Sequence, residues 1–107
     1  MIVGRMTAQE AEDLLKHCLE EGAVIQGRHF RDELDKEKLD FDDVVPVLNR
    51  GKIYGPAEPD IKTAEWKYRI EGHEHGGKWL AIVFSFKAVD RAFLITIFSV
   101  EAREKRP

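Results

Sequence analysis

His29 and the two arginines beside it are the residues of this 107-residue chain whose types and spacing first point to chemistry. His29 stands between Arg28 and Arg31, directly after Gly27, at the expected start of a helix. A histidine titrates near neutral pH, so a histidine flanked by cations can act as general acid or base on a phosphodiester. The ordinary alternative is a histidine in the first turn of a helix with no catalytic role, and the residues alone leave both open.

A second group of cations belongs to an expected strand. Lys67 and Arg69 alternate with apolar residues, so both lie on one face of the strand, about 6.8 Å apart. Lys78 opens the next strand and is expected to pair across near them. A guanidinium can hold two phosphate oxygens and stabilise charge that develops on phosphorus. The alternative is a solvated sheet edge on which these cations pair with Glu65 and Glu71.

The compact histidine group of the chain is His73-Glu74-His75, next to Gly76 and Gly77. Two alternate histidines at a strand end can share a metal ion, but a site needs at least a third ligand that is fixed in place. A glycine-rich turn is a poor support for such a ligand, so a solvated turn is the better interpretation. We expect no metal and no cofactor.

The elements that must position these residues are three successive strands at residues 65–72, 78–86 and 92–100. The first strand alternates between apolar and charged residues, whereas the other two are apolar on both faces, as in strands that are covered on both sides. We therefore expect helices on one face of the sheet and partial cover on the other. Residues 52–54 are a candidate for a fourth, edge strand.

The expected helices precede this meander. Thr7 and Glu10 form a capping box that begins a first helix, and Gly22 ends it. A polar helix is expected at residues 28–38. A third begins after Asp40 or Asp42; if Asp42 is the cap, Pro46 falls at the edge of the first turn, where its missing N–H costs little. Residues 23–26 read as a short extended piece and residues 55–60 as a loop.

Composition indicates one domain over residues 1–107, with a short basic tail from about residue 101. The formal net charge of −3 argues mildly against a general nucleic-acid binder. However, residues 1–60 carry 8 Lys and Arg against 14 Asp and Glu, and residues 61–107 carry 9 against 6. A basic sheet half can mark a nucleic-acid face, although surface helices also collect acidic residues by propensity.

Cys18 is the single cysteine of the chain, so no intramolecular disulfide can form. This favours a reducing, cytoplasmic location. Cys18 lies on the apolar stripe of the first expected helix and is interpreted as a core residue. The longest apolar run, at residues 80–86, is too short to span a bilayer, and we expect no membrane association.

The order of these segments resembles an uncharacterised bacterial domain family related to the RelE, BrnT and MqsR toxins of toxin–antitoxin pairs. The segments that carry the resemblance are GRHF, then LDFDDVVPVLNRGKIY, then YRIEG, KWLAIVF and FLITIFSV. It spans most of the chain and implies an α+β fold of the RelE type. In that fold, N-terminal helices pack on one face of a three- to four-stranded antiparallel sheet.

The resemblance also implies an activity, which is metal-independent cleavage of RNA by a toxin that a cognate antitoxin holds in check. His29 matches the family histidine, Arg69 a basic residue on the first long strand, and Thr96 a threonine on the last strand. The resulting expectation has His29, Lys67 and Arg69 as catalytic residues. The expected RNA-binding residues are Arg28, Arg31, Lys78 and Thr96.

Two positions depart from the family pattern. The family often has arginine four residues after the histidine, where this chain has Glu33, and tyrosine two residues after the threonine, where it has Phe98. A phenylalanine cannot exchange a proton. The second hypothesis is therefore a catalytically inactive relative that acts as a protein- or RNA-binding regulatory module.

Overall fold

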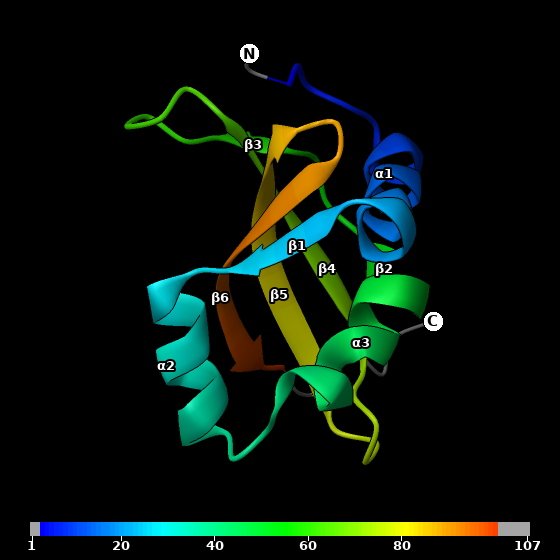
Figure 1. Ribbon diagram of the computed structural model, residues 1–107, viewed down its shortest axis with the longest axis vertical. Coiled ribbons are helices and arrows are strands. Elements are labelled where there is room, and N and C mark those ends of the chain that lie inside the picture. Colours follow the sequence, from blue (N-terminus) through cyan, green and yellow to red (C-terminus); the bar gives the residue numbers. More distant parts are fainter. Residues whose placement is uncertain (1–2, 101–107) are drawn as a thin grey trace.

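The structure, a computed structural model, describes residues 3–100, so the basic tail expected from about residue 101 lies outside it. This part of the chain holds three helices and six strands (Figure 1). In order, they are α1 Ala8–Glu21, β1 Ala23–Gln26, α2 Arg28–Lys36, α3 Phe41–Arg50, β2 Lys52–Ile53, β3 Glu58–Pro59, β4 Trp66–His73, β5 Trp79–Ala88 and β6 Arg91–Ser99. None of these helices is long and apolar enough to cross a membrane.

The sheet is open and mixed, with the strand order β1-β6-β5-β4-β2, and β3 pairs with β4 as well. The antiparallel meander β4-β5-β6 confirms the three expected strands, and β2 confirms the expected edge strand. The expected size and purely antiparallel character of the sheet were wrong. The sheet has six strands rather than three or four, and β1 runs parallel to β6. The α+β class is as expected.

The parallel strand β1 covers only the first half of β6, from Ala23 opposite Arg91 to Gln26 opposite Leu94. Gly27 ends this pairing, and its N–H donates to the Leu94 carbonyl at 2.9 Å. A Cβ atom at Gly27 would lie 2.6 Å from that oxygen. Glycine is therefore required where β1 gives way to α2, which packs against β6.

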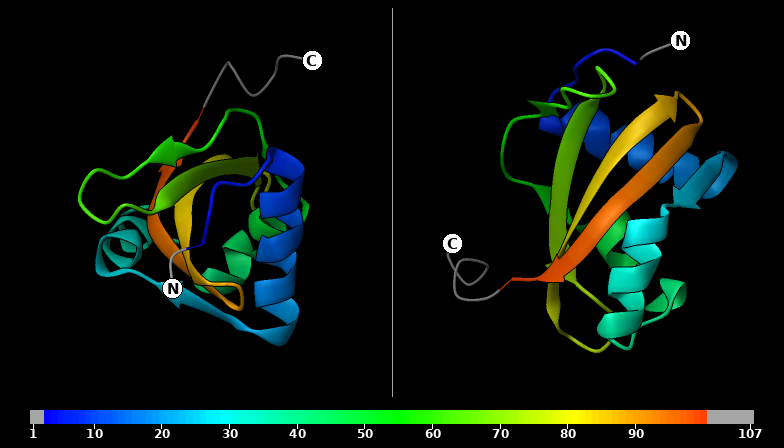
Figure 2. Two further views of the ribbon diagram at one scale, coloured as in Figure 1. Left: turned by 90° about the horizontal axis from the view of Figure 1, so that it is seen from above. Right: turned by 90° about the vertical axis from the view of Figure 1, so that its left-hand side faces the viewer.

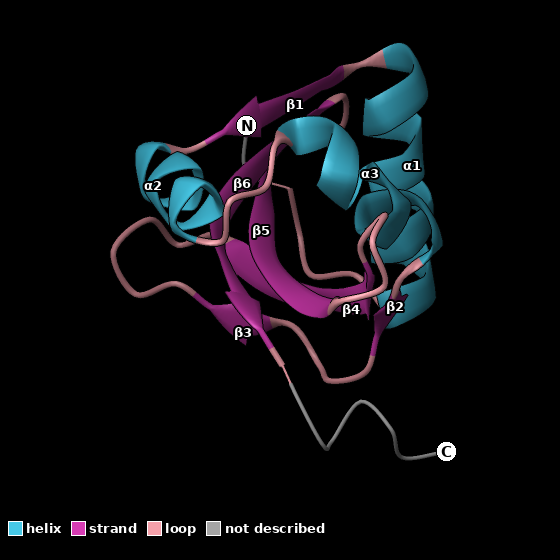
Figure 3. Cartoon of the chain, turned by 90° about the horizontal axis from the view of Figure 1, so that it is seen from below, coloured by secondary structure: helices cyan, strands magenta, loops and turns pink. Residues whose placement is uncertain are grey.

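The core lies between the sheet and the helices α1 and α3. Figure 3 shows the strands bending around these two helices, and the right-hand view of Figure 2 shows β4, β5 and β6 in front of them. The helix α2 lies beside β6 and contributes Phe30, which is fully buried, and Leu34. The helices α1 and α3 thus cover one face of the meander, as the sequence predicted.

The starts of α1 and α3 follow from side-chain capping. In α1, the Thr7 side chain accepts from the Glu10 N–H, and the Glu10 side chain accepts from the Thr7 N–H, which confirms the predicted box. In α3, Asp40 is the cap and forms a second box with Asp43. Because the cap is Asp40 rather than Asp42, Pro46 lies inside the helix and not at the edge of its first turn.

One buried carboxylate joins α1 to the edge strand β2. Glu12 is only 7% exposed, and its Oε2 accepts the backbone N–H of Ile53 at 2.8 Å. An edge-strand donor that faces a helix would otherwise be buried without a partner. The contact therefore fixes how α1 sits against β2.

Replacing Glu12 with alanine should lower the free energy of unfolding by about 1–3 kcal/mol, because the Ile53 N–H loses its buried acceptor. Urea unfolding of the purified variant measures the change. Asp13→Ala, which alters an exposed acid on the same helix, is the matched control and should change stability by less than about 0.5 kcal/mol. Equal stability of the two variants would contradict this role for Glu12.

Burial controls the reactivity of Cys18, which is 1% exposed. Burial, with the Asp90 carboxylate as the next contribution, raises the pKa of the Cys18 thiol to about 11. The thiolate is the reactive form, so alkylation by iodoacetamide at pH 8 should be at least about 100-fold slower in the folded protein than in guanidinium chloride. Mass spectrometry of the alkylated fraction measures both rates, and similar rates would show that the thiol is accessible.

Candidate nucleic-acid interface

Strand β4 carries core residues on one face and charged residues on the other. Tyr68 and Ile70 are buried in the core, whereas Lys67 is half-buried and Arg69 is exposed. The predicted alternation is thus confirmed. The two cations belong to the face opposite the core, which is turned toward the viewer in the right-hand view of Figure 2.

A cavity of about 480 Å³ opens on this face, and we call it the Arg69 cavity. Every residue that lines it comes from a strand or from the loop between β2 and β3. Among them are three predicted site residues, Lys67, Arg69 and Thr96. The structure therefore brings these three to one place.

The strand pairing explains how Arg69 and Thr96 meet. Arg69 is opposite Val83 of β5, and Val83 is opposite Thr96 of β6. The three residues form a row across the sheet, and the outer two backbones are about 9.6 Å apart. Long side chains bridge that distance, so one anion can touch both ends of the row.

The Arg69 guanidinium is held in a defined position. Its Nε donates to Glu71 Oε2 at 2.9 Å, and its central carbon lies 4.9 Å from the centre of the Phe98 ring. The ion pair uses the Nε–H, one of five guanidinium donors. The Arg69 side chain is still 42% exposed, so the residue is oriented by its neighbours and also reaches solvent.

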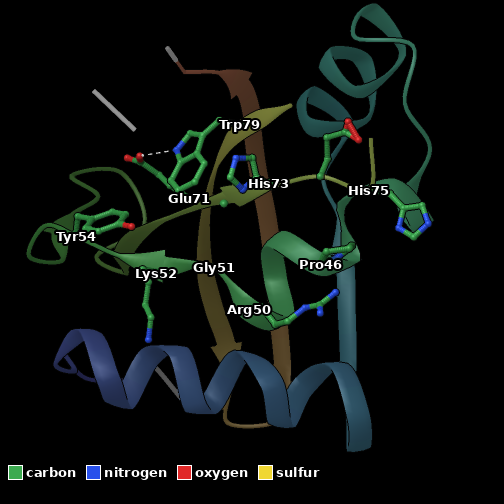
Figure 4. Close-up of a pocket in the computed structure, with 11 residues that line it drawn as sticks. Pro46, Arg50, Gly51, Lys52, Tyr54, Glu71, His73, His75 and Trp79 are labelled. Carbon is green, nitrogen blue, oxygen red and sulfur yellow. Dashed lines mark hydrogen bonds between the residues drawn. The ribbon is translucent and has the colours of Figure 1, made fainter. Parts of the chain in front are cut away.

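Glu71 is the residue that orders this region, and it is 3% exposed. Its second oxygen, Oε1, accepts the indole N–H of Trp79 at 3.2 Å (Figure 4). One carboxylate thus holds an arginine and a tryptophan. In the sequence analysis, Glu71 appeared only as a partner for the cations on a solvated sheet edge. Nothing in the local pattern showed that its carboxylate is buried.

Lys78 lies elsewhere. Its Nζ pairs with Glu37 Oε1 at 2.9 Å, near the end of α2, and Ser99 Oγ donates to the same oxygen at 3.1 Å. The hydrogen bond from Lys78 is the main reason that the pKa of Glu37 is lowered. Lys78 is five residues along β5 from Val83, the partner of Arg69, a separation of about 17 Å. It does not join Lys67 and Arg69 in the cavity.

The three candidates on α2 are also outside the Arg69 cavity. Arg28, His29 and Arg31 are exposed in the first turn of the helix, on either side of the buried Phe30. The structure therefore does not place His29 beside Lys67 and Arg69 among the residues that line the cavity. The catalytic role of His29 stays a prediction.

Two cavity residues were missed by the sequence interpretation. Tyr54 follows β2 and is 63% exposed, and Glu58 of β3 pairs opposite Lys67. Residues 55–60 were expected to be a loop, and a two-residue strand that ends in proline gives no alternation to detect. The available signal was that Tyr54 stands two residues after Lys52, on the same face of a short strand.

The turn after β4 is exposed at His73, His75, Gly76 and Gly77, as expected for a solvated turn, but Glu74 within it is buried. Glu74 is 8% exposed, and its carboxylate accepts the Gly76 N–H within the turn. His73 packs edge-on against Trp79, with ring centres 4.5 Å apart. Among the residues that the structure describes, no group of three or more His, Cys, Asp or Glu side chains is arranged to hold a metal ion.

A protein-family model matches most of this chain. Residues 26–99 match the model of DUF4258, a domain of unknown function. The match runs from the end of β1 through β6, so it includes the whole Arg69 cavity, while α1 lies before it. Among curated proteins, none matches the sequence.

The coupling free energy between Arg69 and Glu71 can be measured by a double-mutant cycle with Arg69→Ala and Glu71→Gln. The two residues are in direct contact, so their effects on the free energy of unfolding should be non-additive by about 0.5–3 kcal/mol. Urea unfolding of the wild type, both single variants and the double variant provides the cycle. Lys67→Ala with Glu71→Gln is the comparison cycle, and equal coupling in both cycles would contradict a specific Arg69–Glu71 contact.

Proposed function

We propose that this chain, which belongs to the DUF4258 family, binds single-stranded RNA through the Arg69 cavity and cleaves it without a metal ion. The observation that carries the proposal is that Lys67, Arg69 and Thr96 line one open cavity on strands. Two cations and a hydroxyl at this spacing suit a phosphodiester, whose oxygens accept hydrogen bonds and carry charge.

The proposed reaction is transesterification within the RNA. The ribose 2′-hydroxyl attacks the neighbouring phosphorus, a new O–P bond forms, and the bond to the 5′-oxygen of the next nucleotide breaks. A base must take the proton of the 2′-hydroxyl, and an acid must supply a proton to the leaving oxygen. Lys67 and Arg69 stabilise the charge that accumulates on the phosphoryl oxygens.

The proton carriers proposed within the cavity are Glu58 and Tyr54. Glu58 is exposed and opposite Lys67 across the β3–β4 pairing, so its carboxylate suits the role of base. Tyr54, in the loop that follows β2, supplies a phenol, whereas β6 carries Phe98 at the position of the family tyrosine. His29 remains a candidate proton carrier from the resemblance. Because it lies on α2, outside the cavity, its removal distinguishes catalysis by His29 from catalysis by Glu58 and Tyr54.

The cellular role we propose is that of a toxin paired with an antitoxin, on the strength of the resemblance to the RelE, BrnT and MqsR toxins. An antitoxin that covers the Arg69 cavity would block RNA from it. The lining cations Lys67 and Arg69 favour a partner segment that carries acidic side chains.

A second candidate is RNA binding without cleavage. It is favoured by the exposed position of His29 on α2, away from the cavity residues, and by Phe98, which packs under Arg69 and cannot exchange a proton. In this candidate the same cavity holds a phosphate, and the protein regulates the RNA or a partner that carries it.

RNA binding should depend on the cavity cations and not on cations elsewhere. Lys67→Ala should weaken binding of a labelled single-stranded RNA several-fold and reduce the slope of log affinity against log salt by about 0.7, because one phosphate contact is lost. Fluorescence anisotropy measures both quantities. Arg28→Ala and Lys78→Ala are the controls, since these residues lie on α2 and beside Glu37.

Cleavage is assayed on the same RNA in the presence of EDTA. Products that form with EDTA and disappear in Arg69→Ala and Glu58→Gln support the first candidate, whereas binding without products supports the second. If His29→Ala abolished the products and Arg69→Ala and Glu58→Gln did not, the reaction would be assigned to α2 and not to the Arg69 cavity. Absence of binding by the wild type would contradict both candidates.

A further inference from the structure

A second cavity lies next to the Arg69 cavity, at the end of β4. It encloses about 340 Å³ between the end of α3, the edge strand β2 and the hairpin that joins β4 to β5. We call it the Trp79 cavity. Figure 4 shows Trp79, Glu71 and His73 on one side of it, with Arg50 and Lys52 on the other.

The two cavities share two lining residues. Tyr54 and Glu71 line both of them. Glu71 also holds one residue of each cavity, because Oε2 accepts from Arg69 and Oε1 accepts from Trp79. The same buried carboxylate therefore sets the relative positions of a cation in one cavity and an aromatic ring in the other.

The Trp79 cavity offers aromatic surfaces for bases. The indole of Trp79 is fixed by its hydrogen bond and by the edge-on contact with His73. The ring of Tyr54 stands at the boundary between the cavities and is 63% exposed. Proteins that bind single strands stack successive bases on such rings while cations follow the backbone.

Cations accompany these rings. The two cations, Arg50 and Lys52, are exposed, and the neighbouring His73 ring is exposed as well. The carboxylates of this cavity have partners within the protein, since Glu71 pairs with Arg69 and Glu74 accepts from Gly76. The local chemistry therefore suits an anion with an attached ring, as in a nucleotide.

We propose that the two cavities form one groove that binds a single strand of RNA over several nucleotides. This inference rests on the proposed function and adds the length of the bound RNA and the rings that hold its bases. Arg69 and His73 are four residues apart on β4, about 13 Å. That is the length of about four stacked nucleotides at ~3.4 Å per phosphate. Because the bases must reach Tyr54 and Trp79, the groove selects unpaired RNA over a duplex.

The test is the dependence of affinity on RNA length, measured by fluorescence anisotropy with labelled oligonucleotides of two and eight nucleotides. The longer RNA should bind at least about 10-fold more tightly to the wild type, since stacking on one ring alone contributes about 5-fold or more. Arg50→Ala, which alters a residue of the Trp79 cavity alone, should remove most of this gain while leaving binding of the dinucleotide nearly unchanged. Tyr54→Ala, which removes a ring that lines both cavities, should weaken binding of the eight-nucleotide RNA by more than it weakens binding of the dinucleotide. Tyr54→Phe, which retains the ring, should keep the gain, and Lys16→Ala on α1 should have no effect.

Quenching of Trp79 fluorescence in a Trp66→Phe background provides a readout that needs no substitution in the groove. The eight-nucleotide RNA should quench Trp79, and a duplex of the same sequence should not. One outcome would reject the groove and keep the proposed function. In it, Lys67→Ala weakens RNA binding, but Tyr54→Ala and Arg50→Ala still bind the eight-nucleotide RNA more tightly than the dinucleotide by the same factor as the wild type. Equal affinity for duplex and single strand would likewise overturn the groove. Failure of every RNA to bind would overturn both proposals.

Discussion

The outer face of this protein depends on one buried carboxylate, that of Glu71. A charge removed from water is costly unless it is paired and hydrogen-bonded. Glu71 meets this requirement with the Arg69 guanidinium on one oxygen and the Trp79 indole on the other. The same two contacts orient a cation and an aromatic ring. The interactions that allow the Glu71 charge to be buried therefore also position residues of the candidate site.

Strand β4 serves the core and the site at once because its side chains alternate. Tyr68 and Ile70 pack under α1 and α3, while Lys67 and Arg69 face outward. The core face fixes the backbone, and the backbone fixes the spacing of the cations. Outside the meander, the bond between Glu12 and Ile53 supports the edge strand β2, which Tyr54 follows. The site therefore rests on packing that lies on the far side of the sheet.

The parts of the fold that were predictable from sequence are those with a repeating signal or a capping pattern. Alternation identified β4, and the capping box at Thr7 marked the start of α1, whereas the sequence left the start of α3 open between Asp40 and Asp42. β1 and β3 were not predictable as sheet members, because four and two residues carry too little alternation. Within the site, the strand period of β4 puts Lys67 and Arg69 together, and the resemblance added Thr96 on β6. No local pattern reports where α2 or Lys78 lies in space.

The central claim is that RNA meets the protein on the outer face of β4, β5 and β6. A titration of isotope-labelled protein with single-stranded RNA, followed through the backbone amide resonances, maps that contact directly. We expect the largest shifts at Lys67, Arg69 and Thr96. Shifts confined to the first turn of α2 at Arg28 and His29, or none at saturating RNA, would contradict the account.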